Sequence, residues 1–301
     1  MKIAIAGGTG FVGKALVNYF QSKGHDIYIL TRNKRRSTID NVHYVQWLTP
    51  ESKPEKEISS VDVMINLAGQ SINSGRWTAE QKNKIFNSRI DSTRAVLNLI
   101  ANLEAKPEVL INASAIGIYG TSQNKVFTET AEKVGNDFLA QTVKAWEEEG
   151  KKAESFGIRT ILARFGIILD KDEGALPRMI MPYRFFMGGT VGSGKQWVSW
   201  IHINDVVRAI DFIINNKNIA GPVNITSPQP VTMKEFGETI ARVLDRPHWL
   251  PIPSVLLNLL LGEMSILVLE GQQVLPDSLE EFGFSFSFSS LEGALCDILQ
   301  S

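Results

Sequence analysis

The sequence predicts an α/β protein with a doubly wound parallel sheet, because short apolar runs alternate with helical patterns through its first two-thirds. The first apolar run enters a glycine-rich turn, and a helical pattern leaves that turn. Proline and glycine interrupt the apolar segments of the last third, which favours a smaller C-terminal lobe on the substrate side. Strands are expected at residues 3–6, 27–30, 42–47, 61–67, 109–113 and 159–165, and helices around residues 12–20, 78–103 and 137–154.

The glycine-rich turn at residues 7–13 reads Gly-Gly-Thr-Gly-Phe-Val-Gly and directly follows the first strand. Glycines there permit a tight turn, let the backbone approach a pyrophosphate and allow close packing of the helix. The helix N-terminus adds free N–H groups and a partial positive charge. This setting predicts a dinucleotide site, whose expected contacts in the turn are Gly7, Thr9, Gly10, Phe11, Val12 and Gly13.

Two structural units are expected from this pattern. Residues 1–170 should form the dinucleotide-binding domain, and residues 195–226 should return to it. Residues 171–194 and 227–301 should form the lobe. Because no repeat or flexible linker separates the two, the lobe should pack on the sheet.

Composition favours small-molecule chemistry. The 301 residues are 44% hydrophobic and 21% charged with a formal net charge of −1, so nothing in the overall charge points to a nucleic acid or a membrane as partner. The single cysteine, Cys296, cannot form an internal disulfide, and no signal peptide precedes the first strand, which predicts a cytoplasmic protein. The most apolar stretch, residues 249–262, is shorter than the ~20 residues that span a bilayer, and is interpreted as a buried helix or an oligomer contact.

Three further segments accompany the glycine-rich turn: Asn66-Leu67-Ala68-Gly69 after the fourth strand, Ala113-Ser114-Ala115 with Tyr119-Gly120 after the fifth, and residues 200–206. With them the chain resembles the short-chain dehydrogenase/reductase superfamily, in its extended, epimerase-like branch. The part after residue 248 is similar to the extra domain, of unassigned function, of a bacterial "epimerase family protein" group. The resemblance covers nearly the whole chain and implies a Rossmann fold and a possible homodimer. The further cofactor contacts that it implies are Asn66, Leu67, Ala68, Gly69 and Phe165.

The end of the second strand indicates which nicotinamide cofactor is preferred. NAD-dependent relatives place there an acidic residue that binds the ribose hydroxyls, whereas this chain has Thr31-Arg32-Asn33. Arg32, helped by Arg35 or Arg36, offers a planar group suited to a 2′-phosphate, which predicts NADP. The alternative is that residues 32–36 are only a solvated basic loop.

The catalytic pair of the superfamily is expected to be absent. Its Tyr-x-x-x-Lys motif supplies a tyrosine whose pKa the lysine lowers, but the corresponding positions hold Leu139 and Val143. Tyr119 and Ser114, after the fifth strand, are then the candidate catalytic residues, with a wall of the cofactor pocket as the alternative role for Tyr119. Arg89, on the long helix, is a candidate anchor for a ribose, a phosphate or a carboxylate, unless it forms a surface ion pair with Asp91.

The same comparison of positions disfavours a nucleotide-sugar substrate. Places that hold an arginine and an asparagine in nucleotide-sugar epimerases hold Val198 and Ile167 here. Trp77, Trp197 and Trp200 would suit a more apolar ligand if they reached the cleft. The four scattered histidines argue against a metal site, and His202 is expected to be a core histidine rather than an acid.

These observations together predict an NADP(H)-binding, epimerase-like oxidoreductase or redox epimerase of an unknown small molecule. The alternative is a non-catalytic sensor of the NADPH/NADP ratio that has lost the catalytic pair. A sensor should present an apolar surface to a partner, and residues 256–269 could supply it.

Overall fold

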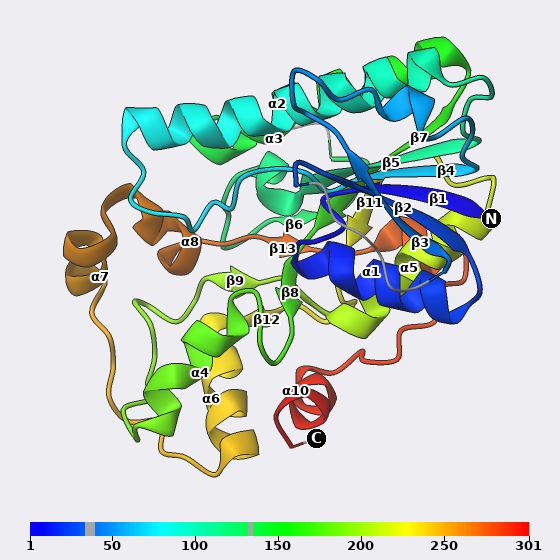
Figure 1. Ribbon diagram of the computed structural model, residues 1–301. Helices are drawn as coiled ribbons and strands as arrows, with labels where there is room; N and C mark the ends of the chain where they lie inside the picture. Colours follow the sequence, from blue (N-terminus) through cyan, green and yellow to red (C-terminus); the bar gives the residue numbers. More distant parts are fainter. Residues whose placement is uncertain (34–39, 132–134, 301) are drawn as a thin grey trace.

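The computed structural model describes residues 1–33, 40–131 and 135–300. Its centre is a seven-stranded parallel sheet in the order β11-β7-β5-β4-β1-β2-β3 (Figure 1). The predicted doubly wound sheet is thereby confirmed. The strands are β1 (Lys2–Ala6), β2 (Asp26–Thr31), β3 (Val42–Gln46), β4 (Val63–Asn66), β5 (Val109–Ala115), β7 (Arg159–Phe165) and β11 (Gly221–Ile225).

Helices cover both faces of this sheet. One face carries α1 (Phe11–Ser22) and α5 (Ile203–Asn215), and the other carries α2 (Ala79–Asn102) and α3 (Phe138–Lys151) (Figure 1). Short 3-10 turns lie at Pro54–Lys56, Ile116–Tyr119 and Lys152–Phe156. The segment Ile116–Tyr119 directly follows β5, so it lies at the carboxyl edge of the sheet, where ligands of such folds bind.

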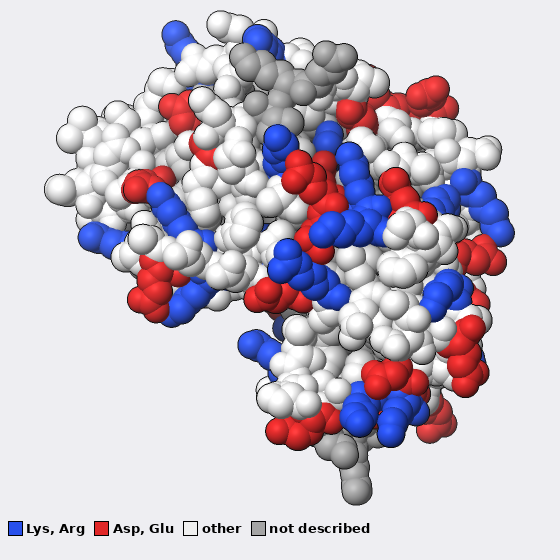
Figure 2. All heavy atoms as spheres, turned by 90° about the horizontal axis from the view of Figure 1, so that it is seen from above, with Lys and Arg blue, Asp and Glu red and all other residues white. Residues whose placement is uncertain are grey.

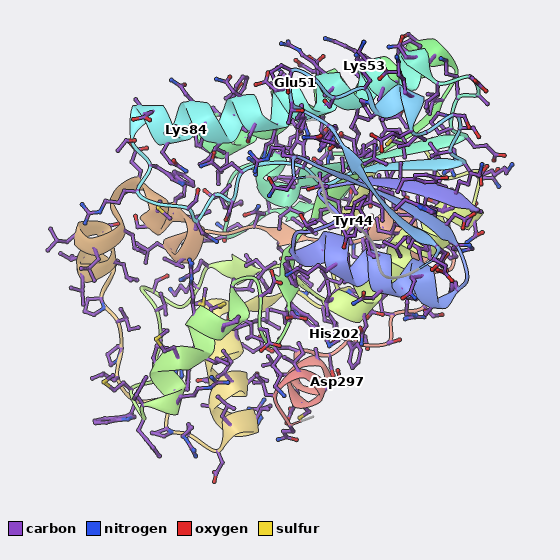
Figure 3. All side chains as sticks on the ribbon, in the orientation of Figure 1. Tyr44, Glu51, Lys53, Lys84, His202 and Asp297 are labelled. Atoms are coloured by element: carbon purple, nitrogen blue, oxygen red, sulfur yellow. The ribbon has the colours of Figure 1, made fainter. Side chains whose placement is uncertain are left out.

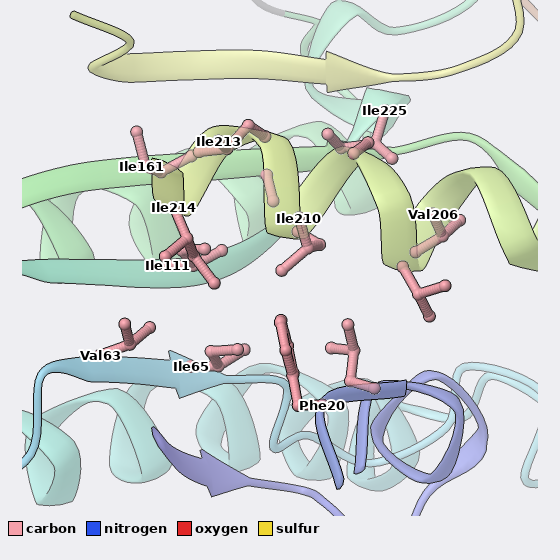
Figure 4. Close-up of a cluster of buried hydrophobic side chains, with 14 of the residues drawn as sticks. Phe20, Val63, Ile65, Ile111, Ile161, Val206, Ile210, Ile213, Ile214 and Ile225 are labelled. Carbon is pink, nitrogen blue, oxygen red and sulfur yellow. The ribbon is translucent and has the colours of Figure 1, made fainter. Parts of the chain in front are cut away.

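Buried aliphatic side chains hold the layers together. Figure 4 shows Ile210, Ile213 and Val206 of α5 facing side chains of the central strands, with Phe20 of α1 beside them. The continuous apolar strands are explained by this arrangement, because a parallel sheet covered on both faces exposes neither of them to water.

A lobe lies at the carboxyl edge of the sheet. Its core is formed by α4 (Leu176–Arg184), α6 (Met233–Leu244) and α10 (Leu291–Gln300), with Trp200 fully buried among them. Two small pairings connect the lobe to the chain leaving β7. They are β8 (Ile167–Leu169) with β10 (Trp200–His202), in parallel, and β9 (Trp197–Val198) with β12 (Val231–Thr232), antiparallel.

The segment after α6 departs from one expectation. It forms α7 (Ser254–Leu261), a 3-10 turn at Gly262–Ser265 and α8 (Ile266–Leu269), and then returns to the sheet through β13 (Gln273–Val274), which pairs with β6 (Val126–Phe127), and through α9 (Asp277–Glu281). The buried-helix interpretation of residues 249–262 is wrong, because α7 buries none of its residues and Val255 and Leu259 are each 77% exposed.

The surface carries charges of both signs. On the face shown in Figure 2, acidic and basic side chains are interspersed. None of the helices in the described ranges combines the length and apolarity needed to cross a bilayer.

Candidate active site

A cavity of about 790 Å³ lies between the carboxyl edge of the sheet and the lobe. Its walls come from the glycine-rich turn, the loop after β4, the start of α3, the chain leaving β7 and the segment around α8. The structure therefore brings together parts of the chain that are almost 270 residues apart in sequence. The sequence-predicted cofactor residues that line the cavity are Gly7, Gly10, Phe11, Val12, Gly13, Leu67, Gly69, Arg89 and Phe165.

The glycine-rich turn is shaped to receive an anion. Gly10 is the N-cap of α1, and no side chain of the described residues caps that helix, so its first turn lines the cavity with N–H groups that have no side-chain acceptor. Gly7 has a φ of 81°, and a Cβ on Gly13 would lie 2.2 Å from the carbonyl oxygen of Gly7. Only glycine fits at both positions, and the turn fits the pyrophosphate of a dinucleotide.

Asn66 holds the loop that follows β4 through buried hydrogen bonds and does not line the cavity. Its amide nitrogen donates to Oδ1 of Asn112 (2.7 Å) and to Oγ1 of Thr93 (3.1 Å), and its Oδ1 accepts from the backbone N–H of Ala68 (3.2 Å). Trp146 of α3 donates to the same hydroxyl of Thr93 (3.0 Å). The cofactor contact of Asn66 stays a prediction; its hydrogen bond holds the backbone of Ala68, between Leu67 and Gly69, which do line the cavity.

Arg89 lies in the cavity wall and is not paired with Asp91. Its Nη1 donates to the carbonyl oxygens of Gln70 (3.0 Å) and Ile85 (2.9 Å), and its guanidinium carbon lies 5.1 Å from the ring centre of Trp146. Burial lowers the pKa of Arg89 to about 10, so the side chain is still a cation at neutral pH. Among the described residues no carboxylate forms an ion pair with it, so an anion entering the cavity would gain a strong partner.

The start of α3 presents an apolar face to the cavity. Asp137 caps this helix by accepting from the N–H groups of Leu139 and Ala140, and the helical spacing then places Leu139, Val143 and Trp146 along one wall. Leu139 and Val143, the positions that the sequence comparison aligns with the Tyr-x-x-x-Lys pair, therefore face the cavity with aliphatic side chains.

The two predicted catalytic hydroxyls lie elsewhere. Tyr119 is only 4% exposed, donates to Oδ1 of Asn224 (2.8 Å) and accepts from Nη1 of Arg164 (2.8 Å). Ser114 donates to Oε1 of Glu147 (2.6 Å), and Glu147 forms a bidentate ion pair with Arg164 at 2.7 and 2.8 Å. Neither Tyr119 nor Ser114 is among the residues that line the cavity.

The electrostatics of Tyr119 also differ from those of a catalytic tyrosine. Burial raises the pKa of its hydroxyl, and this outweighs the opposing effect of the Arg164 cation. The superfamily mechanism needs the opposite shift. The catalytic role of Tyr119 and Ser114 stays a prediction, and the geometry gives both a part in a buried polar network beneath the cavity.

The end of β2 lies beside the turn but outside the cavity lining. Arg32 and Thr9 are exposed, and Thr31 is half-buried, its hydroxyl accepting from the N–H of Asn33 at 3.4 Å. Ala68, whose carbonyl accepts from Ser92, does not line the cavity either. Arg35 and Arg36 lie outside the described residues.

The far wall contains residues that sequence reasoning missed. Ile266 and Leu267 of α8, with Gln272, reach the cavity from the lobe side, and Arg178 of α4 and Ser199 line it nearby. Ile266 and Leu267 had a sequence signal in the apolar character of residues 256–269, whereas Arg178, Ser199 and Gln272 had none, because the folding of the lobe brings them there. Arg76 donates to the carbonyl oxygen of Leu260 (3.0 Å), and Lys82 forms an ion pair with Glu263. These two contacts hold the segment from α7 to α8 against the loop after β4 and the start of α2.

The remaining predicted aromatic and apolar positions divide between wall and core. Ile167 and Trp197 line the cavity, whereas Val198 and Trp200 are buried and do not. Trp77 is buried edge-on against Phe138.

His202 lies on the lobe side, away from the cavity lining. It is buried and stacked on Phe288; its Nδ1 accepts from the N–H of Asn204, and its Nε2 lies 3.2 Å from Oδ2 of Asp297 (Figure 3). Within the described ranges, no three His, Cys, Asp or Glu side chains are arranged to hold a metal ion.

Comparisons with known proteins agree with this architecture. A family model described as NAD dependent epimerase/dehydratase family matches residues 3–226, and a domain of unknown function, DUF1731, matches residues 252–298. The chain is 50% identical to "Epimerase family protein YfhF" of Bacillus subtilis over 299 residues, covering 99% of this chain and 98% of the relative. It is 46% identical to "Epimerase family protein SH2119" of Staphylococcus haemolyticus over 297 residues, again covering 99% and 98%.

One solved structure extends the comparison to three dimensions. The crystal structure of human epimerase family protein SDR39U1 (isoform 2) with NADPH superimposes with a TM-score of 0.89 at 27% sequence identity. The match covers 100% of both chains. It therefore includes the C-terminal lobe as well as the sheet.

Proposed function

The chain belongs to the NAD dependent epimerase/dehydratase family, and on that premise we propose that it is an NADP(H)-dependent oxidoreductase or redox epimerase of a small molecule. The observation that carries the proposal is one continuous cavity, which joins the glycine-rich turn to the apolar start of α3. When bound, the nicotinamide would supply or take up a hydride. The chain would hold the dinucleotide through its first α1 N–H groups and Arg89.

The rest of the cavity favours a substrate other than a nucleotide-sugar. Ile167 and Leu267 line it, and the indole N–H of Trp197 is already donated to the carbonyl of Gln123. A diphosphate lying against these three side chains would therefore lose water without gaining hydrogen-bond donors, although Arg178 also lines the cavity. The protein's part in the reaction is then to exclude water and to orient the reacting carbon.

The test of turnover is isotopic. Purified protein is incubated with an extract of small metabolites and NADPH deuterated at C4, each face in turn, and deuterium is sought in the metabolites by mass spectrometry. Protein-dependent incorporation is expected and would identify the substrate. Confirmed NADPH binding without incorporation from either face would contradict an oxidoreductase and leave a redox epimerase that returns its hydride to the same molecule.

The proposed preference for NADP rests on the end of β2. Arg32 is exposed there beside the turn, and the sequence holds no carboxylate from Thr31 to Asn33 that would repel a 2′-phosphate. The human relative that superimposes on this chain was crystallised with NADPH.

Replacing Arg32 by alanine should lower the affinity for NADPH by about 10- to 100-fold, because a charge-assisted contact to phosphate contributes about 1.5–3 kcal/mol. The affinity for NADH should change less than about threefold. Titration calorimetry measures both, and Arg32→Lys, which keeps the charge but loses the planar fork, should lie between alanine and wild type. An equal change for the two nucleotides would mean that residues 32–36 are only a solvated loop.

Replacing Arg89 by methionine should weaken NADPH binding about tenfold or more while changing the free energy of unfolding by less than about 1 kcal/mol. The substitution removes the cation of the wall but keeps a long apolar side chain beside Trp146, and it relieves the cost of a buried charge. Arg94→Met is the matched control, since Arg94 lies on the same helix, pairs with Glu149 and does not line the cavity. Equal NADPH affinities of the two variants would remove Arg89 from the site.

A sensor is the second candidate, favoured by the segment that joins α7 to α8. Val255, Leu256, Leu259 and Leu260 of α7 are exposed, and the end of the molecule that carries α7 in Figure 1 is largely uncharged in Figure 2. The same segment reaches the cavity through Ile266, so a bound nucleotide could alter the exposed surface. A sensor should bind NADPH and NADP with clearly different affinities, whereas similar affinities would argue against it.

A further inference from the structure

We propose that the substrate is a conjugated, apolar carbonyl compound of the quinone class, which is reduced without a proton donor from the protein. This proposal rests on the proposed function and deepens it by naming the chemical class of the acceptor. It follows from the side chains that the cavity wall presents at the positions aligned above with the Tyr-x-x-x-Lys pair.

The part of the cavity wall that α3 forms is aliphatic at the two positions aligned with the Tyr-x-x-x-Lys pair. Leu139 and Val143 face the cavity, and Ile116 and Gly117, which follow β5, line it beside them. Ile72 and Leu267 add apolar surface from the β4 loop and from α8. An apolar ring system is stabilised when it buries its surface against such walls.

No tyrosine, lysine, histidine or cysteine is found among the described residues that line the cavity. The hydroxyl groups of the lining are alcohols, and two of them are already engaged: Thr142 donates to the carbonyl of Phe138 and Ser199 to that of Gln272. Three carboxylates line the cavity: that of Asp137 caps α3, that of Glu173 pairs with Lys14, and that of Glu270 belongs to an exposed residue just after α8. The phenol of Tyr119, outside the lining, is held in the network with Arg164 and Asn224.

The basicity of the product oxygen decides which acceptors this wall permits. Hydride addition to an isolated ketone leaves an alkoxide, whose basicity is close to that of hydroxide, so it needs a proton donor at once; water itself has a pKa of about 16. Hydride addition to a quinone leaves a phenolate, because the charge is delocalised into a ring that becomes aromatic. A phenol has a pKa of about 10, so this anion persists until it meets solvent.

The overall reaction balances without a protein acid. The quinone gains one hydride from the bound reduced dinucleotide and one proton from water, its two C=O groups become C–OH groups, and the dinucleotide is left oxidised. The residues of the chain bind the ring, exclude water from the reacting carbon and hold the dinucleotide through the glycine-rich turn and Arg89.

Two bicyclic ligands of similar size test the proposal: dimethylnaphthoquinone and tetralone. The first is a quinone whose ring positions are fully substituted, so it does not alkylate Cys296, and the second carries a single carbonyl. Wild-type protein with NADPH should consume the quinone at least about 100-fold faster than tetralone, which is the lower end of what general acid catalysis contributes. Calorimetric titration of the protein with NADP present should also detect binding of the quinone, independently of turnover.

The second experiment introduces a Tyr-x-x-x-Lys pair into α3. The variant L139Y/V143K should raise the ratio of tetralone to quinone turnover by about tenfold or more, because the lysine would lower the pKa of the new phenol. The matched control L139F/V143M adds similar bulk without an ionisable group, and its ratio should stay within about threefold of wild type. If the first variant does not fold, a superfamily reductase that carries the Tyr-x-x-x-Lys pair serves as the reference, and its ratio of tetralone to quinone turnover should exceed that of the wild-type protein by about tenfold or more.

The outcomes are distinguishable. Tetralone reduced by wild type as fast as the quinone would overturn the proposal, and so would NADPH binding without binding or turnover of the quinone; either result would leave the proposed function standing. Failure of NADPH to bind would overturn the proposed function and this proposal together.

Discussion

Replacing Glu147 by leucine should lower the free energy of unfolding by about 3–5 kcal/mol, which is the typical cost of leaving a buried charge without its partner. Glu147 and Arg164 are 4% and 7% exposed, and two short hydrogen bonds join them. The substitution would leave the Arg164 cation buried, with Tyr119 as its remaining side-chain hydrogen-bond partner among the described residues. Urea unfolding followed by circular dichroism measures the loss.

A double variant separates the charge effect from lost packing. E147L/R164M should recover about 1–4 kcal/mol relative to the single variant, because apolar residues of similar volume often replace a buried ion pair without a net cost. Glu292→Leu is the control, since Glu292 and Arg242 form an exposed pair that should contribute less than about 1 kcal/mol. A loss below about 1 kcal/mol for Glu147→Leu would mean that water reaches Arg164.

Replacing Gly13 by alanine should abolish or greatly weaken dinucleotide binding and lower the free energy of unfolding by about 1–3 kcal/mol. The new Cβ would lie 2.2 Å from the carbonyl oxygen of Gly7 and 2.7 Å from the Cα of Gly8, so the backbone of the turn must move. Because this backbone is also the surface on which the pyrophosphate would lie, the same movement should lower NADPH affinity at least tenfold. Calorimetric titration with NADPH and thermal unfolding measure the two effects.

A second glycine provides the control. Gly293 lies in α10, away from the cavity, and a Cβ there would approach only the hydroxyl of Ser290, at 3.1 Å. Gly293→Ala should therefore leave NADPH affinity unchanged and alter stability by less than about 1 kcal/mol, since alanine is the better helix former. If Gly13→Ala binds NADPH as tightly as Gly293→Ala does, the turn is not the anion site.

The sequence by itself determined the sheet and the glycine-rich turn, and it predicted an aliphatic helix face at Leu139 and Val143. These features depend on local rules: apolar runs that alternate with amphipathic helices specify layers, and the backbone of Gly7 and Gly13 admits no side chain. Counting along one helix from Trp146 also placed Leu139 and Val143 on one face, because helical spacing is fixed.

Only the tertiary structure decided which side chains meet in the cavity. Tyr119 and Ser114 lie at or just after the end of β5, but their hydroxyls form hydrogen bonds with the buried Glu147–Arg164 pair and do not line the cavity. The loop after β4 and α3 bury Arg89, and the folding of the lobe brings Leu267 to the opposite wall. The physical reason is that burial and the direction of a buried side chain are set by partners far along the chain, whose hydrogen bonds and packing no local pattern encodes.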